Sequence, residues 1–213
     1  MEPSEIPELA RYRSVRRFVR KHLDMQFADV RTMLRLPLPE LGLHGGCNFA
    51  AAATLCDLLS GISVVLFDPP PRYYQTKQQQ EAKQKGRDRG IRFKALLDGY
   101  FLWEQGQRKA ACISVLYDRV RNPLAHELAL DRKGSRTKVA ILKKPLSEEQ
   151  IVEMESSTAR PSWLPQPIER RGRRWRLSVP GLYWGTFQVL KRLTLDRFQM
   201  DAAGKHLSRR RVY

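Results

Sequence analysis

Histidine is the side chain best suited to proton transfer at neutral pH, and this chain has four of them. His22 lies on the apolar face of a predicted helix, His44 in a glycine-rich turn, and His206 in a basic C-terminal segment. His126 differs, because it ends the polar segment Arg121-Asn122-Pro123-Leu124-Ala125-His126 within an otherwise amphipathic helix. The imidazole of His126 is therefore the candidate general acid or base.

The residues before His126 supply a candidate phosphate site. Asn122 and Pro123 suit the N-cap and first position of a helix, so either the helix kinks at Pro123 or a new helical segment begins there. In the second case, free backbone N–H groups beside Arg121 would form a seat for a phosphate. Asn122 and His126 are four residues apart and so share a helix face. A phosphate held by Arg121 would then lie near the imidazole.

This segment resembles the motif of the HEPN superfamily (higher eukaryotes and prokaryotes nucleotide-binding): an arginine, a polar residue that is often asparagine, and then a histidine, here with the spacing R-x4-H. The resemblance is specific over residues 115 to 130, loose over the first 130 residues and absent from the rest. It implies a helical bundle, usually a homodimer, in which the motifs of two chains meet and cleave RNA without a metal. It assigns the catalytic roles to Arg121, Asn122 and His126.

Two features of the sequence limit what the motif implies. Arg17 and His22 have the same spacing, but Phe18 stands where the family has a polar residue, so we treat this second match as fortuitous. Many toxin members of the family have a tyrosine two places after the histidine, through which a partner nucleotidyltransferase silences them. Leu128 occupies that place here.

The structural alternative is that the motif only stabilises the fold. In that case Arg121 pairs with Asp118 or Glu127, and His126 caps a helix or packs against it. Other catalytic patterns are absent from the sequence: there is no P-loop, and the second histidine of a zinc protease is replaced by Leu130. The acidic residues near the motif are a sparse set in a basic chain: Asp118, Glu127 and Asp131. We therefore expect no metal and no cofactor.

The charge of the chain indicates a polyanionic partner. Its 213 residues carry 39 Lys plus Arg against 22 Asp plus Glu, a net charge of +17, and 27 of the cations are arginine. Arginine grips phosphate through two parallel hydrogen bonds, so RNA is the expected partner. The alternatives are a basic surface that serves solubility or one that binds an acidic protein.

Two arginine clusters are the candidate RNA-binding surfaces. The first lies on one face of an amphipathic helix predicted for residues 6 to 23, and a solvated outer face or a membrane-surface helix has the same pattern. Its arginines are Arg13, Arg16, Arg17 and Arg20. The second lies in a predicted hairpin over residues 168 to 179, turning at Gly172, where an aromatic ring among cations could stack a base. An edge hairpin with one packed tryptophan is the alternative. Its members are Arg170, Arg171, Arg173, Arg174 and Trp175.

Apolar periodicity predicts a mainly α fold, a HEPN-like helical bundle with a small mixed α/β C-terminal extension. The helical core spans residues 1–130 with an exposed basic insertion at 68–90. The apolar run at 48 to 67 has the length of a membrane span, but Asp57 favours a buried bundle helix. Residues 131–213 supply short strands, a capping box at Ser147 and Gln150, the basic hairpin and a last helix over 182 to 195, packed on the same domain.

Together these observations predict a metal-independent, homodimeric endoribonuclease in the cytoplasm, because no secretory signal is evident in the N-terminal residues. The resemblance implies a role in bacterial antiviral defence, for example in a CRISPR-associated system, or in a toxin-like stress response with a regulatory or antitoxin protein as partner. The alternative is a non-catalytic HEPN-like module that binds RNA or protein. A third possibility is an adaptor that uses residues 11 to 21 on a membrane surface or an acidic protein.

Overall fold

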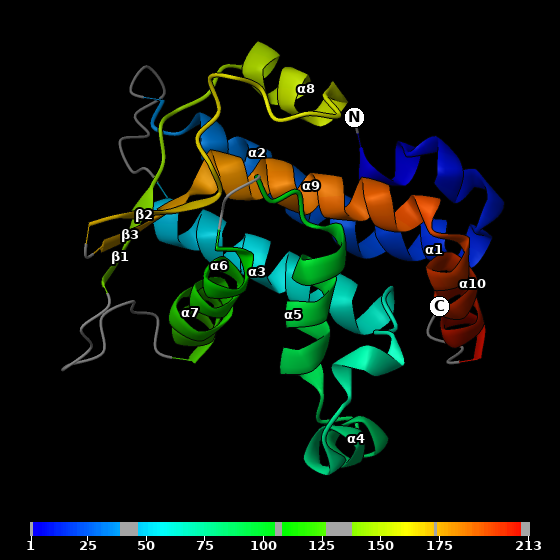
Figure 1. Cartoon of the computed structure of the whole chain (residues 1–213). Coiled ribbons are helices and arrows are strands. Elements are labelled where there is room, and N and C mark those ends of the chain that lie inside the picture. The colour runs from blue at the N-terminus through cyan, green and yellow to red at the C-terminus, as the bar shows by residue number, and fades with distance from the viewer. Residues whose placement is uncertain (1, 39–46, 105–107, 127–137, 173, 210–213) are drawn as a thin grey trace.

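The computed structural model of the chain describes residues 2–38, 47–104, 108–126, 138–172 and 174–209, with the backbone alone at 125 and 126 (Figure 1). The described chain is mainly helical, with one small sheet, as predicted. The helical elements, in chain order, are the 3-10 turns η1 (Pro3–Glu5) and η2 (Pro7–Arg11), α1 (Arg13–Phe18), the π-helical turn η3 (Val19–Leu23), α2 (Asp24–Arg35), α3 (Asn48–Val65), the 3-10 turn η5 (Pro71–Tyr73), α4 (Lys77–Gln84), α5 (Arg89–Tyr100), α6 (Lys109–Val115), the π-helical turn η6 (Leu116–Arg121), α7 (Asn122–His126), α8 (Glu148–Ser156), α9 (Val179–Leu195) and α10 (Arg197–Arg209).

The first long helix begins later and runs further than the predicted 6 to 23. Elements α1, η3 and α2 follow one another without a break, up to the extended backbone at Leu36, which precedes Pro37. The apolar residues that repeat at helical spacing along this run are buried. They are Val15, Phe18, Val19, Leu23, Phe27, Val30 and Leu34.

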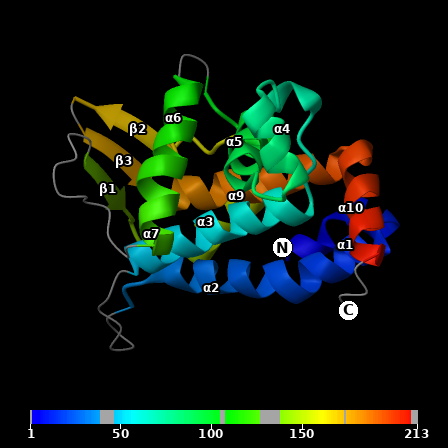
Figure 2. The same ribbon diagram turned by 90° about the horizontal axis from the view of Figure 1, so that it is seen from below.

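Helix α3 lies between α2, α5 and α9 and buries one apolar face against them (Figure 2). Leu55, Leu58 and Ile62 are almost completely inaccessible on that face. Among the described residues, α3 is the one helix whose length and composition would allow it to cross a membrane. A core helix of a bundle has the same composition, and its packing places α3 in the bundle core.

Helix α9 is the centre of the core, although it belongs to the C-terminal extension. Its side chains are buried almost throughout, including the large aromatic rings of Tyr183, Trp184 and Phe187. The Oγ of Ser178 accepts a hydrogen bond from the N–H of Gly181 at 3.1 Å and so caps the helix start. A Cβ at Gly185 would clash with the ring of Phe101, so glycine permits this close approach. The extension thus completes the core that the N-terminal helices begin.

The sheet confirms the predicted hairpin and adds a parallel strand to it. Strands β1 (Lys138–Leu142), β2 (Ile168–Arg171) and β3 (Arg174–Ser178) lie in the order β1-β3-β2. The β2–β3 pair is antiparallel around Gly172, which has a positive φ of 60°, and β1 pairs with β3 in parallel. Strand β3 is therefore the central strand of the sheet.

Two segments differ from the sequence expectation. Residues 68–90 are not uniformly exposed, because the hydroxyl of Tyr74 donates to the buried Asp88 carboxylate at 2.6 Å. The basic C-terminal segment that contains His206, beyond the last predicted helix, forms α10, which packs against α1. In both views α1 and α10 lie together at one end of the bundle and the sheet lies at the other (Figures 1 and 2).

Candidate functional site

The helix that carries the R-x4-H motif is continuous through Pro123. Elements α6, η6 and α7 follow one another directly, and Asn122 has helical dihedral angles of φ −65° and ψ −47°. The N–H of Asn122 donates to the carbonyl of Tyr117, five residues back. This wider turn accommodates a proline, which has no N–H and would clash with the carbonyl four residues before it. Of the two sequence alternatives, no new helix begins here, and no free helix N-terminus lies beside Arg121.

Two neutral oxygen atoms hold the guanidinium of Arg121. Its Nε donates to the Oγ of Ser60 on α3 at 3.3 Å, and its Nη1 donates to the Oδ1 of Asn122 at 3.0 Å. The ring of Tyr117 lies beneath the guanidinium, with its centroid 5.8 Å from Cζ. The Ser60 hydroxyl donates to the carbonyl of Cys56 at 2.8 Å, which leaves its lone pairs for Arg121. Arg121 is therefore half-buried and fixed in direction.

Within the described residues, no carboxylate forms an ion pair with Arg121. Asp118, its predicted structural partner, instead pairs with Lys94 at 3.1 Å and accepts a hydrogen bond from Ser114 at 2.8 Å. Glu127, the other predicted partner, lies outside the described residues, as does Asp131. The positive charge of Arg121 is thus held in place without being neutralised by an acid of the described chain.

A hollow of about 240 Å³ lies at the Arg121 side chain, between α3, α5 and η6. Arg89 and Tyr117 line it together with Arg121, so two guanidinium groups and an aromatic ring face one small space. The floor is apolar, and Phe93 contributes to it. A Cβ on Gly90 would lie 2.6 Å from the Tyr117 hydroxyl, so this glycine allows Tyr117 to pack against α5. We refer to this space as the Arg121 hollow.

No reactive thiolate lies beneath the Arg121 hollow. Burial raises the pKa of the Cys56 thiol to about 12, and the nearby Asp57 charge adds to this effect, while Arg121 opposes it. A thiol with such a pKa stays protonated at neutral pH and is a poor nucleophile. Cys56 is therefore not a candidate nucleophile for this hollow.

The motif histidine is only partly described. The backbone of His126 closes α7, one helical turn after Asn122, which keeps these two residues on one face. The side chain of His126 lies outside the described part of the structure. The fortuitous match at Arg17 and His22 lies elsewhere: His22 is half-buried in η3, with its ring 5.1 Å from that of Phe18.

The N-terminal arginine cluster divides into two groups. Arg13 and Arg17 line a hollow between α1 and α10. Arg16 donates from Nε to the carbonyl of Ser4 at 3.1 Å and so anchors the N-terminal turn. Arg20 is exposed and does not line that hollow.

Two of the hairpin arginines are engaged within the hairpin itself. Arg170 donates to the carbonyl of Gly172 at 3.1 Å, and Arg171 pairs with Glu169 at 2.9 Å. Arg174 is exposed, whereas Arg173 lies outside the described residues. Trp175 is half-buried and packs against the core, the arrangement of the alternative interpretation of this hairpin.

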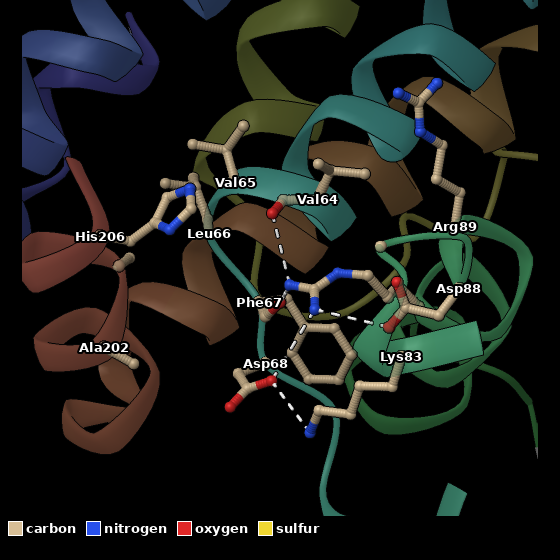
Figure 3. A pocket seen from close by; sticks show the side chains of 13 residues that line it. Val64, Val65, Leu66, Phe67, Asp68, Lys83, Asp88, Arg89, Ala202 and His206 are labelled. Atoms are coloured by element: carbon tan, nitrogen blue, oxygen red, sulfur yellow. Dashed lines mark hydrogen bonds and ion pairs between the residues drawn. The ribbon is translucent and has the colours of Figure 1, made fainter. Parts of the chain in front are cut away.

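A second, larger hollow of about 510 Å³ lies beside the C-terminal end of α3, bounded by α5 and α10 (Figure 3). Its central cation, Arg92, donates to the carbonyls of Ser63 at 2.9 Å, Val64 at 3.3 Å and Phe67. Arg92 also pairs with two acids, Asp68 at 3.7 Å and Asp88 at 3.9 Å. This arginine caps the end of α3 and is fully engaged inside the protein. We refer to this space as the Arg92 hollow.

The described residues include no group of three or more His, Cys, Asp or Glu side chains placed to hold a metal ion. Comparison of the chain with protein-family models, with curated proteins and with solved structures finds no match.

Proposed function

We propose that the chain is a metal-independent endoribonuclease whose catalytic residues are Arg121, Asn122 and His126. The observation that carries the proposal is the state of Arg121: its guanidinium is fixed by Ser60 and Asn122, and no described carboxylate neutralises it. A fixed, uncompensated guanidinium is suited to an external phosphate, because it can grip two phosphate oxygens at once. RNA is the polyanion that also supplies its own nucleophile.

The reaction needs a base, an acid and a cation. The base removes the proton of a ribose 2′-hydroxyl, whose oxygen then attacks the adjacent phosphorus atom. The bond from phosphorus to the 5′-oxygen breaks, and the acid donates a proton to that oxygen. His126 supplies the proton transfers and Arg121 stabilises the charge on the phosphoryl oxygens, while Asn122 orients Arg121.

A homodimer would supply two copies of His126, one as base and one as acid. The helix geometry supports this arrangement, because five residues of α-helix place Arg121 and His126 about 140° apart around the axis. A phosphate on Arg121 of one chain would then be served most directly by a histidine of the other. The proposed setting is bacterial defence or a toxin-like stress response in the cytoplasm, with RNA as substrate.

The second candidate function is a non-catalytic module that binds RNA or protein through the same basic surface. The net charge of +17 favours it as much as it favours the nuclease. The two candidates differ in one observable, which is whether RNA is cut.

The test is to incubate labelled single-stranded RNA with purified protein in EDTA. We expect cleavage by the wild type and a loss of about 10²- to 10³-fold in rate for Arg121→Ala, the range measured for removal of a single charge-stabilising group. The matched control is Arg119→Ala, which removes the same charge from an exposed position two residues earlier on the same helix. This control should retain the wild-type rate.

Two results would refute the nuclease. RNA that stays intact with wild-type protein would favour the binding module. Equal losses of rate in Arg119→Ala and Arg121→Ala would show that only the charge of the helix matters, and not the held guanidinium.

A further inference from the structure

The hollow between α1 and α10 is larger than the Arg121 and Arg92 hollows, and the proposed catalytic site does not use it. It has a volume of about 1100 Å³ and is open to solvent. The cations that line it come from both walls: Arg11, Arg13, Arg17, Lys205 and Arg209. We refer to it as the terminal groove, because its walls are the first and last helices of the chain.

The cations of the terminal groove have no acidic partners in the part of the chain that the structure describes. None of the five forms an ion pair within the described residues, and the one carboxylate in the lining is Asp201, so five positive charges and one negative charge give a net of +4. Several cations elsewhere do form ion pairs, as Lys109 does with Asp98 at 2.7 Å. Placing like charges together costs free energy, so this arrangement favours binding of an external polyanion.

An exposed aromatic residue of α10 lies at helical spacing from residues that line the groove, although it is not itself in the lining. Phe198 is 71% exposed, the highest value among the exposed large apolar side chains. It precedes Asp201 by three residues and Lys205 by seven, so it shares with them the face of α10 that lines the groove. Tyr12 lines the opposite wall. Rings beside cations are the arrangement with which proteins hold single-stranded nucleic acid, since every base has a face that can stack.

We propose that the terminal groove binds the phosphate backbone of single-stranded RNA and that Phe198 stacks one of its bases. The inference rests on the proposed function in taking RNA as the substrate, and it adds a docking surface distinct from the cleavage site. The groove favours a strand over a lipid surface, because its cations line a concave space rather than one flat face. It also selects among the N-terminal arginines: Arg13 and Arg17 contact RNA, and Arg16 and Arg20 do not.

The test uses a fluorescent single-stranded RNA with 2′-O-methyl sugars, which cannot be cut by 2′-hydroxyl attack. Affinity is measured against salt for wild type and for Lys205→Gln/Arg209→Gln. Loss of two phosphate contacts should lower the slope of log affinity against log salt by about 1.4 and weaken binding about tenfold at 0.1 M salt. Arg13→Gln/Arg17→Gln, on the other wall, should give the same change and guards against a local folding defect in α10.

The matched control is Lys77→Gln/Arg87→Gln, which removes two charges from exposed positions outside the groove. This variant should keep the wild-type slope. An equal fall in slope for the control and the groove variants would overturn the proposal, because it would show that RNA responds only to net charge.

A second pair of variants tests the aromatic contact. Phe198→Ala should weaken RNA binding about fivefold or more, the lower end of the effect of removing a stacking ring. Leu195→Ala removes a side chain that is 64% exposed at the end of α9 and should leave binding unchanged. Equal losses in both variants would remove base stacking from the proposal.

Vesicles of phosphatidylcholine with phosphatidylserine provide the competing partner. Groove variants that lose vesicle binding but keep wild-type RNA binding would overturn the proposal in favour of a membrane surface. A different result would refute the catalytic proposal. If RNA binds in the groove but is never cut, the catalytic proposal is wrong and the docking proposal stands. If a groove variant binds RNA with unchanged affinity and cuts it at the normal rate, the docking proposal is wrong and the catalytic proposal stands.

Discussion

The two hollows beside the C-terminal half of α3 are lined by Arg92 and Arg121 respectively, and Val64, Val65 and Arg89 line both. In the Arg92 hollow, three carbonyls and two carboxylates surround the guanidinium. In the Arg121 hollow, one hydroxyl and one amide oxygen hold the guanidinium, with no described carboxylate. The same side chain therefore serves in one hollow as part of the fold and in the other as a cation available to a ligand.

The groups that bond each guanidinium distinguish a role in stability from a role in activity more clearly than the exposure of the side chain does. Both arginines are half-buried, so their accessibility alone does not distinguish them. What distinguishes them is whether a carboxylate of the described residues neutralises the charge of the guanidinium. The internally neutralised arginine should be required for folding, and the uncompensated one should be required for catalysis.

The largest effect on stability is expected for Arg92→Ala. This change uncaps α3 and leaves the carboxylate of Asp88 buried without its cation, so the free energy of unfolding should fall by about 3 kcal/mol. Chemical denaturation with urea measures it. The matched variant Arg121→Ala should lose about 1 to 2 kcal/mol, because it breaks two hydrogen bonds and leaves no described carboxylate without its cation.

A loss of similar size in the two variants would contradict the comparison. It would mean that Arg121 is also part of the framework, and its effect on RNA cleavage would then follow from unfolding.

Arg121→Lys should have a smaller effect than Arg92→Ala, and the effect should be on the rate of RNA cleavage rather than on stability. Lysine keeps the positive charge but lacks the planar fork that bonds Ser60 and Asn122 while facing a phosphate. We expect the rate of RNA cleavage at saturating substrate to fall about tenfold, which corresponds to about 1.4 kcal/mol. Single-turnover kinetics measure this rate. A lysine variant as slow as Arg121→Ala would show that the fork is essential, and one as fast as wild type would show that charge alone suffices.

Ser60→Ala should have the smallest effect of the three. It removes one of the two oxygens that orient Arg121, a hydrogen bond of 3.3 Å worth about 1 kcal/mol. Cleavage should slow about fivefold, with the affinity for RNA unchanged. Thr54→Ala, on the same helix, loses an equivalent hydroxyl bonded only to the carbonyl of Ala50 and should retain the full rate.

The sequence predicted the elements whose signals are local. The capping box of Ser147 and Gln150 is present at the start of α8, because each residue supplies the backbone partner of the other. The hairpin around Gly172 is likewise present, because a glycine there adopts the positive φ of the turn. Helix α10 was missed because its sequence is polar and follows a helix end at Asp196, and its packing on α1 is a contact between distant parts of the chain.

The candidate site likewise has features that local sequence signals predict and features that depend on contacts between distant parts of the chain. The spacing of Arg121, Asn122 and His126 is visible in the sequence, whereas their surroundings are not. Ser60 lies 61 residues from Arg121, and no local pattern indicates that they meet. The π-helical turn that carries the helix through Pro123 was also unforeseen, since its hydrogen bonds depend on how the helix packs. Arg89, on α5, lines the Arg121 hollow because of the way the chain folds, and no pattern in the sequence near Arg121 indicates it.

The chemistry of the cut ends tests the central claim most directly. Labelled RNA is incubated in EDTA with wild-type protein and with His126→Ala, and the termini of the products are identified. The account predicts a 2′,3′-cyclic phosphate or 3′-phosphate with a free 5′-hydroxyl, no cleavage of DNA, and no products with His126→Ala. Products with a 5′-phosphate, activity that is lost in EDTA, or full cleavage by His126→Ala would contradict it.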